Sequence, residues 1–431
     1  MDKNRQTYSK KFKIIVSLCA VGIMILSFFG GFLTHYLMVG RDANTIAWLI
    51  RTIENNYYYD EGDGTVRQFS AEDYADTLVK ELLDKYSAFY TKDEYSDIIY
   101  TSRGNSYGVG LSFLIETAET DTSIYKVSGN SPSEKAGLRA GDIILAGEYD
   151  GTRIALDTKT KVLEFLGIPK DNESFYLYIA DNGGEKRVEL KKSAFIKSYV
   201  YYADNMQTVR LHGDGALAPT PTAFSGGIDG LSDDTGYISL TEFDGKAGEQ
   251  LKSILSVFNE RGKTKLILDL CDNGGGYMTV LSEVASCLTY SDGERRPIIA
   301  VAKDKKGRVE KFRADGDNFN RAITEIVVLA NDYTASASEC LIGAMSHYKK
   351  GFSLDNLVVV GGRPATTYGK GIMQTTYRNF FSGEALKLTT AFIYQPDGRT
   401  SIHGTGFVAT AENSVSSHQN AIVRAVQILN A

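Results

Sequence analysis

Short apolar runs alternate with longer segments of helical character between residues 236 and 362, and this alternation constrains the fold more than any other feature. The apolar runs cover residues 236–240, 265–270, 325–330 and 356–362, and helices are expected at residues 248–262, after Gly276 and at residues 336–348. Strands that are joined by helices pair in parallel, and the helices cover the sheet. The sequence therefore predicts an α/β fold whose sheet is covered on both faces.

The residues before this sheet divide into two further parts. Residues 41–103 show a helical spacing of apolar residues, and Ser70 followed by acidic residues predicts a helix start. Residues 104–192 contain short strands punctuated by glycine, which predict a small β-rich domain. Residues 193–431 would then form the main domain, with residues 205–235 as a linker or an inserted flap. The expected class is a multidomain α/β (α+β) protein with a mixed sheet.

The N-terminus combines a basic tail with a long uncharged run. Residues 1–13 carry a net charge of +4, and residues 14–40 are 27 residues without a charge. About 20 apolar residues span the hydrocarbon core of a bilayer, so residues 14–40 predict a transmembrane helix. Because positive charge favours the cytoplasmic side, we expect residues 1–13 in the cytoplasm and residues 41–431 outside it. Cleavage of a signal peptide near Gly30-Gly31 is the alternative.

Charge and cysteine content exclude several classes of protein. The chain has a net charge of −6, so the residues after residue 13 sum to −10, which argues against nucleic acid as a partner. The cysteines form no CxxC pair and no Cys/His spacing typical of zinc, so no metal or organic cofactor is expected. We expect free thiols at Cys271, Cys287 and Cys340, with a Cys271–Cys340 disulfide as the alternative.

Functional groups in α/β sheets gather beyond the carboxyl ends of strands, and two strand ends in this sequence are unusual. The first, at residue 270, leads into Cys271-Asp272-Asn273 and three glycines, Gly274, Gly275 and Gly276. Backbone N–H groups in such a loop are free of side-chain cover and can approach a negative charge closely. A plain strand-to-helix turn is the alternative, and a P-loop fits less well because no GKS or GKT follows.

The second strand end, at residue 330, leads through small residues to Ser336 at the start of a helix. There the helix dipole and the unpaired N–H groups favour an oxyanion. A serine that only caps the helix is the alternative, since a nucleophile also needs a base. His347 would lie about 16 Å away along the same helix, which is too far for direct proton transfer.

Lysine is the other candidate base. His212, His403 and His418 stand in no recognisable motif, whereas Lys370 lies between two glycines, Gly369 and Gly371. A lysine base must be neutral, so its pKa must fall from about 10.4 towards about 7–8. Gln374 could orient the amine through a neutral hydrogen bond, which would not raise the pKa of Lys370 as a carboxylate would.

Eight stretches of the chain, taken in order, resemble the carboxy-terminal processing (tail-specific) proteases of peptidase family S41. They extend from about residue 45 to residue 410 and read LLDKYSAFYTKDEY, SYGVGLSF, SPSEKAGLRAGDIIL, GYISLTEF, LILDLCDNGGG, NDYTASASE, YGKGIMQ and ALKLTTAFIYQPDGRTSIHGTG. TASASE followed by GKGxxQ is the most specific of these motifs.

The resemblance implies catalytic roles for seven residues. Ser336 would be the nucleophile, Lys370 the general base, Gln374 its orienting residue, Glu339 a supporting residue, and Ala337 with Gly275 or Gly276 the oxyanion hole. It also implies that residues 104–192 are a PDZ-like domain that binds a substrate's C-terminal tail by strand addition. The tail carboxylate would be held by the loop Tyr107, Gly108, Val109, Gly110, Leu111, Ser112 and Phe113.

Three departures from the family pattern concern the candidate site. Residues 349–356 lengthen the stretch between the serine and the lysine, and residues 205–235 are also longer than expected. Cys271 and Gly274 occupy positions where the family commonly has Arg and Pro.

The expected function is that of a membrane-anchored, extracytoplasmic serine endopeptidase that acts on protein tails through an acyl-enzyme. Its partners would be protein or peptide substrates and the membrane, and the sequence leaves a homo-oligomer open. A catalytically inactive, membrane-tethered PDZ scaffold is the alternative. A Ser-His-Asp hydrolase would instead need His212 or His403 beside Ser336.

Overall fold

The computed structural model describes residues 10–57, 69–113, 118–181, 183–203, 208–211, 217–219, 228 and 230–431. The side chains of residues 10, 13–14, 32–42, 126, 208–211 and 217–219 lie outside that description. The chain divides into two compact units, Met1–Leu82 and Leu83–Ala431.

The first unit contains two helices, α1 (Lys10–Asn56) and α2 (Ala71–Leu82). The expected helix start at Ser70 is confirmed, because its hydroxyl accepts the Asp73 N–H at 3.1 Å and Asp73 accepts the Ser70 N–H at 2.7 Å. Helix α1 continues past residue 40, where the sequence placed the end of the transmembrane segment. Among the described residues, no helix reaches the length and apolar character needed to cross a bilayer. The side chains of residues 32–42, part of the expected span, belong to those not described.

The second unit begins with a strand, β1 (Ala88–Tyr90), a capped helix, α3 (Lys92–Thr101), and a β-rich module. In the module, β5 (Ile144–Tyr149) lies between β6 (Thr152–Ala155) and β7 (Ser174–Asp181), and β8 (Gly184–Lys191) pairs with β7. Two short helices, α4 (Pro132–Lys135) and α5 (Lys159–Gly167), complete it around a core that contains Phe165 and Phe175. The β-rich character that the sequence predicted for this region is confirmed.

The run SYGVGLSF forms two short strands rather than one. β2 (Asn105–Gly108) pairs with β9 (Ser193–Ile196), and β3 (Leu111–Ser112) pairs with β4 (Lys126–Val127). Gly110 separates them with a φ of +80°, and a Cβ there would lie 2.3 Å from Ser131 Cβ. Because β9 follows residue 192, the pairing of this module extends past the expected boundary.

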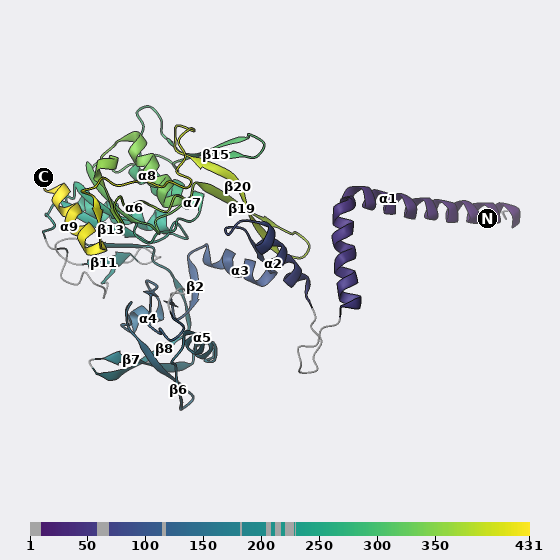
Figure 1. The fold of residues 1–431 in the computed structure, drawn as a ribbon, viewed down its shortest axis with the longest axis horizontal. Helices are drawn as coiled ribbons and strands as arrows, with labels where there is room; N and C mark the ends of the chain where they lie inside the picture. Colours follow the sequence, from purple (N-terminus) through teal and green to yellow (C-terminus); the bar gives the residue numbers. More distant parts are fainter. Residues whose placement is uncertain are drawn as a thin grey trace, which may run out of the picture. The chain divides into compact units, whose positions relative to one another are not determined.

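The largest sheet among the described residues has the order β12-β11-β10-β13-β14-β17-β18-β21. Its strands β11 and β13 are labelled in Figure 1. Its strands β13 (Thr235–Leu240), β14 (Lys265–Asp269), β17 (Glu325–Asn331), β18 (Leu357–Val360) and β21 (Ser414–Val415) run parallel. Antiparallel pairs add β10 (Val200–Ala203), β11 (Thr208–Leu211) and β12 (Leu217–Pro219). Within residues 205–235, predicted as a linker or an inserted flap, β11 and β12 extend the sheet.

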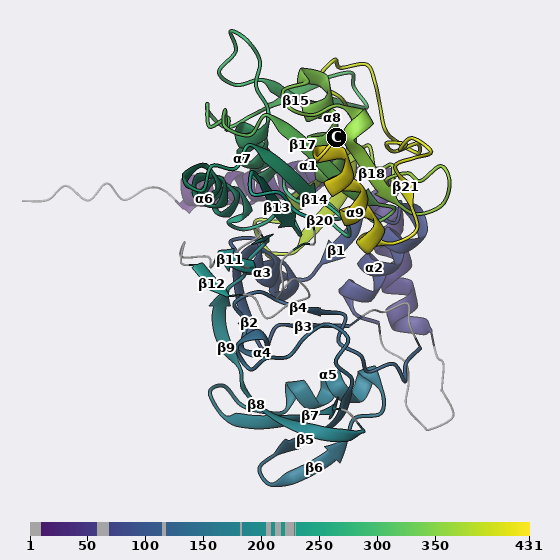
Figure 2. The same cartoon turned by 90° about the vertical axis from the view of Figure 1, so that its left-hand side faces the viewer.

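Helices cover both faces of this sheet, as the sequence predicts. Alternate residues of a strand point to opposite faces. Leu266 and Leu268 pack with α6 (Ala247–Glu260), α7 (Met278–Leu288) and α8 (Ala337–Tyr348), whereas Ile267 packs with α9 (His418–Leu429). Figure 2 shows α9 over the parallel strands.

A second sheet brings distant segments together around β20 (Ala385–Tyr394). One side of β20 pairs with β19 (Ile372–Arg378), and the other side pairs first with β1 and then with β15 (Ile298–Asp304). β16 (Val309–Arg313) pairs with β15. Residues that precede β1 and β19 therefore meet at one side of this sheet, and Lys370 is among them.

Candidate active site

Ser336 lies at the end of a tight turn between β17 and α8, where the sequence predicted it. Its φ of +58° and ψ of −115° are rare for a residue with a side chain, and the residue is partly exposed. Such strain persists only where the surroundings enforce it, and it clusters at functional sites. Here the Thr334 hydroxyl donates to the Leu270 carbonyl at 2.8 Å and the Ala335 N–H donates to the Asn273 carbonyl at 3.0 Å.

The glycine loop after β14 lies directly against this serine turn. A Cβ on Gly275 would lie 2.8 Å from Ala335 O, Ala337 N and Ser336 Cβ, and the φ of Gly275 is +102°. A Cβ on Gly274 would meet nothing within 4 Å. The close approach therefore requires glycine at position 275 and not at position 274.

The expected oxyanion donors differ in their surroundings. The Gly275 N–H already donates to Asn273 Oδ1 at 3.0 Å, so a donor role for it would require that bond to be shared. Ala337 is the first residue of α8, and the N–H of a first helical residue has no acceptor within its helix. Gly276 is exposed and has a φ of +146°. Of the three expected donors, only the Gly275 N–H has a hydrogen-bond acceptor among the described residues.

Glu339 ties the serine turn to the lysine loop. Its side chain is fully buried, and its Oε2 accepts the N–H of Ser336 at 3.0 Å and the N–H of Lys370 at 2.9 Å. Its Oε1 accepts the hydroxyl of Thr367 at 2.6 Å and the N–H of Gly369 at 2.7 Å. Because one oxygen atom binds both amides, the backbones of Ser336 and Lys370 are close neighbours.

Lys370 lies just before β19 and is partly buried, with its Nζ 4.8 Å from the centre of the Tyr86 ring. Burial lowers the pKa of the Lys370 amine below its ordinary value, and the positive charge of Lys387 lowers it further. Tyr368, Asp84 and Glu339 oppose this shift. None of the ion pairs among the described residues involves Lys370, so the Asp84 and Glu339 carboxylates act on the amine only from beyond ion-pair distance.

Residues that sequence reasoning left without a role surround the lysine. The Tyr86 and Tyr368 hydroxyls lie 3.1 Å apart, and Lys85 Nζ donates to the Tyr368 hydroxyl at 2.6 Å. The hydrogen bond from Lys85 lowers the pKa of Tyr368. Lys85 and Tyr86 belong to the stretch LLDKYSAFYTKDEY, so the motif itself was the only signal that could have found them.

The side chains of the expected Ser336–Lys370–Gln374 set are not joined by hydrogen bonds in the described structure. Gln374 Nε2 instead donates to Thr389 Oγ1 at 3.1 Å. Residues 349–356 form a left-handed turn at Lys349 and a short 3₁₀ helix, Leu354–Asn356, and leave the Glu339 contacts in place. The backbones of Ser336 and Lys370 therefore lie close together, and their side chains need to rotate before they can meet.

The other expected site residues occupy separate positions. His347 lies on α8, as predicted, and His403 contacts the Phe392 ring, whereas His212 lies outside the described residues. In the expected peptide-binding loop, Tyr107 is 49% exposed and Val109 is buried in the module core. Described cysteines are free thiols, which agrees with the expectation for Cys271, Cys287 and Cys340.

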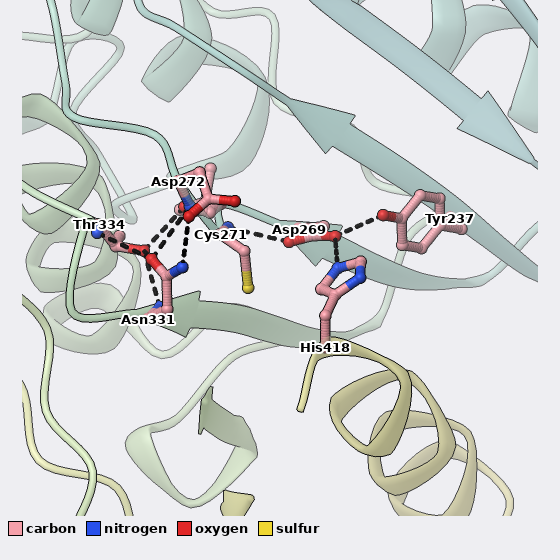
Figure 3. A network of polar contacts seen from close by, with 8 residues as sticks. Tyr237, Asp269, Cys271, Asp272, Asn331, Thr334 and His418 are labelled. Carbon is pink, nitrogen blue, oxygen red and sulfur yellow. Dashed lines mark hydrogen bonds and ion pairs between the residues drawn. The ribbon is translucent and has the colours of Figure 1, made fainter. Parts of the chain in front are cut away.

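A second polar cluster lies where β14 meets the start of α9 (Figure 3). Asp269 Oδ2 is 2.5 Å from His418 Nε2 and also accepts the Tyr237 hydroxyl, while Asp269 Oδ1 accepts the Cys271 N–H at 2.9 Å. The hydrogen bond to Asp269 raises the pKa of His418. Sequence reasoning missed this cluster because 149 positions separate Asp269 from His418.

Replacement of Glu339 by Gln should destabilise the protein and displace the lysine loop. In glutamine, an NH2 group would replace one of the two carboxylate oxygens. This group is a donor and would face two other donors, at an expected cost of about 3 kcal/mol of folding free energy. Thr367→Val removes one donor to Glu339 and the acceptor of the buried Phe407 N–H, and should cost about 2 kcal/mol. Urea unfolding of both variants measures the difference, and a Glu339→Gln protein as stable as the wild type would contradict the assigned contacts.

The chain is similar to proteins that are described as serine proteases. "Probable CtpA-like serine protease" of Staphylococcus haemolyticus (strain JCSC1435) is 27% identical over 368 residues, which are 85% of this chain and 64% of the relative. The protein of the same name from Staphylococcus aureus (strain N315) is 27% identical over 358 residues, or 82% and 61% of the two chains. The chain thus spans less than two thirds of the length of these relatives.

Among solved structures, the photosystem II D1 C-terminal processing protease aligns with a TM-score of 0.46 and 23% identity over 86% of this chain and 87% of the other. The family model described as "Peptidase family S41" matches residues 234–412, which include the serine turn, the glycine loop and the lysine loop. Residues 234–412 are therefore a peptidase family S41 domain, and this domain contains the candidate active site.

Proposed function

We propose that this protein is a serine endopeptidase in which Ser336 is the nucleophile and Lys370 the general base. The observation that carries the proposal is the shared oxygen of Glu339, which binds the N–H groups of Ser336 and Lys370. Two further features support it: the strained backbone of Ser336 and the lowered pKa of the Lys370 amine. Strained, pKa-perturbed groups that meet in one place are typical of catalytic sites.

The reaction would be acyl transfer through a covalent intermediate. The neutral amine of Lys370 takes the proton of the Ser336 hydroxyl as the oxygen attacks the peptide carbonyl, and then gives it to the leaving amine. The N–H groups of Ala337 and Gly276 stabilise the oxyanion of the tetrahedral intermediate. Water then hydrolyses the acyl-enzyme, again with Lys370 as the base. Rotation about the Lys370 side chain, which no carboxylate restrains, brings the amine to the hydroxyl.

The β-rich module is proposed to bind a substrate's C-terminal tail as a PDZ-like domain. The exposed Tyr107 and the short strands β2 and β3 offer backbone groups to an added strand. Substrates with a free C-terminal carboxylate should then be cleaved faster than the same substrates with a C-terminal amide. Equal rates for the two forms would remove the tail-binding role.

Residues 14–40 are proposed to anchor the protein in the cell membrane, with the catalytic domain outside the cytoplasm. The support is the run of 27 uncharged residues behind a basic tail. An anchored chain stays in the membrane fraction after alkaline carbonate extraction, and release of the full-length chain into the supernatant would overturn the proposal.

An inactive peptide-binding scaffold is the second candidate function. Its support is that no hydrogen bond joins Ser336 Oγ to Lys370 Nζ among the described residues. A scaffold would bind tails and release no cleavage products, so an assay of turnover separates the two functions.

Replacement of either catalytic residue should abolish turnover of a quenched fluorescent protein substrate by the full chain. We expect Ser336→Ala, Lys370→Met and Lys370→Arg to lower kcat/KM by at least about 10³-fold, because arginine keeps the charge but cannot act as a base. Wild-type kcat/KM should rise with pH through an ionisation below the ordinary lysine value of 10.5, since only the neutral amine is active. Turnover by Ser336→Ala would sink the proposal.

The same variants test the burial of the charge. The pKa of Lys370 is lower in the folded than in the unfolded chain, so the charged amine costs stability at neutral pH. That cost disappears as pH rises towards the unfolded pKa. Lys370→Met should therefore have a higher melting temperature than the wild type at pH 7, with a difference that shrinks towards pH 10.

Alanine substitutions in the glycine loop provide a matched pair. Gly275→Ala should lower kcat/KM by at least about 10²-fold, because the new methyl group would overlap the serine turn and displace the nucleophile. Gly274→Ala adds the same methyl group to open space and should stay within about threefold of the wild type. Similar losses in both variants would show that loop flexibility, rather than the close approach of Gly275, matters.

A further inference from the structure

Three side chains of different chemistry converge at the edge of the sheet beside α9. They are the Asp269 carboxylate, the Cys271 thiol and the His418 imidazole, and their possible ligand atoms all lie within 4.8 Å of one another. Asp269 and Cys271 come from the end of β14, and His418 is the first residue of α9 (Figure 3). None of the three has a role in the proposed peptidase reaction.

The carboxylate in this cluster is held as a metal ligand usually is. Asp269 is 3% exposed, and its Oδ1 is fixed by the Cys271 N–H at 2.9 Å. The Tyr237 hydroxyl, itself fully within the core, donates to Oδ2. Partners of this kind orient a ligand and are a regular feature of metal sites. The side chain of His418 is 45% exposed, which leaves an entry path for an ion.

An ion pair between His418 and Asp269 explains only part of the arrangement. It accounts for the contact at 2.5 Å, whereas the sulfur beside both groups takes part only through a hydrogen bond of the Cys271 thiol to Asp269. Burial raises the pKa of the Cys271 thiol, and the Asp269 carboxylate raises it further, so an unassisted nucleophilic role is disfavoured. A metal ion uses all three groups at once.

We propose that Asp269, Cys271 and His418 form a three-ligand site for Zn²⁺, with the fourth position open to water. Nitrogen, oxygen and sulfur donors together suit a borderline-soft ion that prefers tetrahedral coordination. With metal–ligand bonds of about 2.0–2.3 Å, ligand atoms lie about 3–4 Å apart. The ion would replace the proton shared by His418 and Asp269, and the two atoms would separate accordingly.

The position of the site connects it to the loop that supports the nucleophile. Directly after Cys271, the Asp272 N–H donates to Asn331 Oδ1 at 3.0 Å, and Asn331 Nδ2 donates to Asp272 Oδ1 at 2.6 Å. Asn331 Oδ1 also accepts the Thr334 N–H at 3.1 Å, two residues before Ser336. An ion bound to Cys271 would therefore fix the start of the glycine loop.

Cobalt is a suitable probe, because Co²⁺ occupies zinc sites and a thiolate ligand adds a charge-transfer absorption band. The full chain in mild detergent, dialysed against a chelator, should bind one equivalent of Co²⁺ with this band, and Zn²⁺ should displace it. Cys271→Ser should remove the band, and His418→Asn should weaken binding by at least about 100-fold. Tyr237→Phe should weaken it by about 10–100-fold, as expected for a partner of a ligand.

Matched controls separate this site from other thiols and imidazoles. Cys287→Ser and His347→Asn change the same residue types outside the cluster, and both should bind Co²⁺ as the wild type does. Far-UV circular dichroism of each variant shows whether it is folded. Asp269→Asn is a third ligand variant, and if it does not fold, Cys271→Ser and His418→Asn are sufficient to test the site. Absence of Co²⁺ and Zn²⁺ binding at millimolar metal, or a band that survives in Cys271→Ser, would overturn the proposal. These readouts do not depend on peptidase activity.

Discussion

The buried carboxylate of Glu339 is the interaction on which the candidate active site depends. A carboxylate out of contact with water is tolerated only when hydrogen bonds satisfy its oxygens, and Glu339 receives four. Three of the donors are backbone N–H groups, which cannot rotate away as side chains can. The start of α8 and the loop before β19 are thus fixed to each other although no hydrogen bond joins Ser336 to Lys370 in the described structure.

The serine turn needs a second support, because its backbone is strained. That support comes from the neighbouring strand end, since β14 and β17 are adjacent parallel strands and their carboxyl ends emerge side by side. Asn273 accepts from Ala335 and Ser338 through its carbonyl, and Gly275 fits under the turn only because it has no side chain. The glycine loop therefore has a mechanical role beside its proposed role as an oxyanion donor.

Alternate side chains of strand β14 point to opposite faces of the sheet. Leu266, Leu268 and Leu270 pack on the side of α6, α7 and α8, whereas Ile267 packs with α9. By the same alternation, Asp269 points to the α9 side and meets His418. One strand end thus supplies both the loop beside Ser336 and the carboxylate of the proposed metal site, which gives a physical route by which an ion could affect the nucleophile.

Local pattern determined most of the elements of this protein. Periodicity alone predicts β13, α6, β14, α7, β17, α8 and β18, because a buried strand and an amphipathic helix each repeat their apolar residues at a fixed spacing. The small residues before Ser336 were enough to predict that the Ser336 hydroxyl lies at the start of a helix. The sequence pattern around Lys370 left open whether it is the base, and this assignment came from the resemblance to a family. The strands β11 and β12 escaped prediction because Gly- and Pro-containing sequence carries little strand signal.

Only the tertiary structure decided which distant residues meet. Glu339 joins Lys370 across 31 positions, Tyr86 approaches Lys370 through the pairing of β1 with β20, and Asp269 meets His418 across 149 positions. Such contacts arise from the order of strands in a sheet and from the packing of α9. Neither the strand order nor this packing can be predicted from periodicity in the sequence. The sequence by itself therefore determined that Ser336 and the glycine loop follow the ends of two strands, and the folded chain decided what surrounds them.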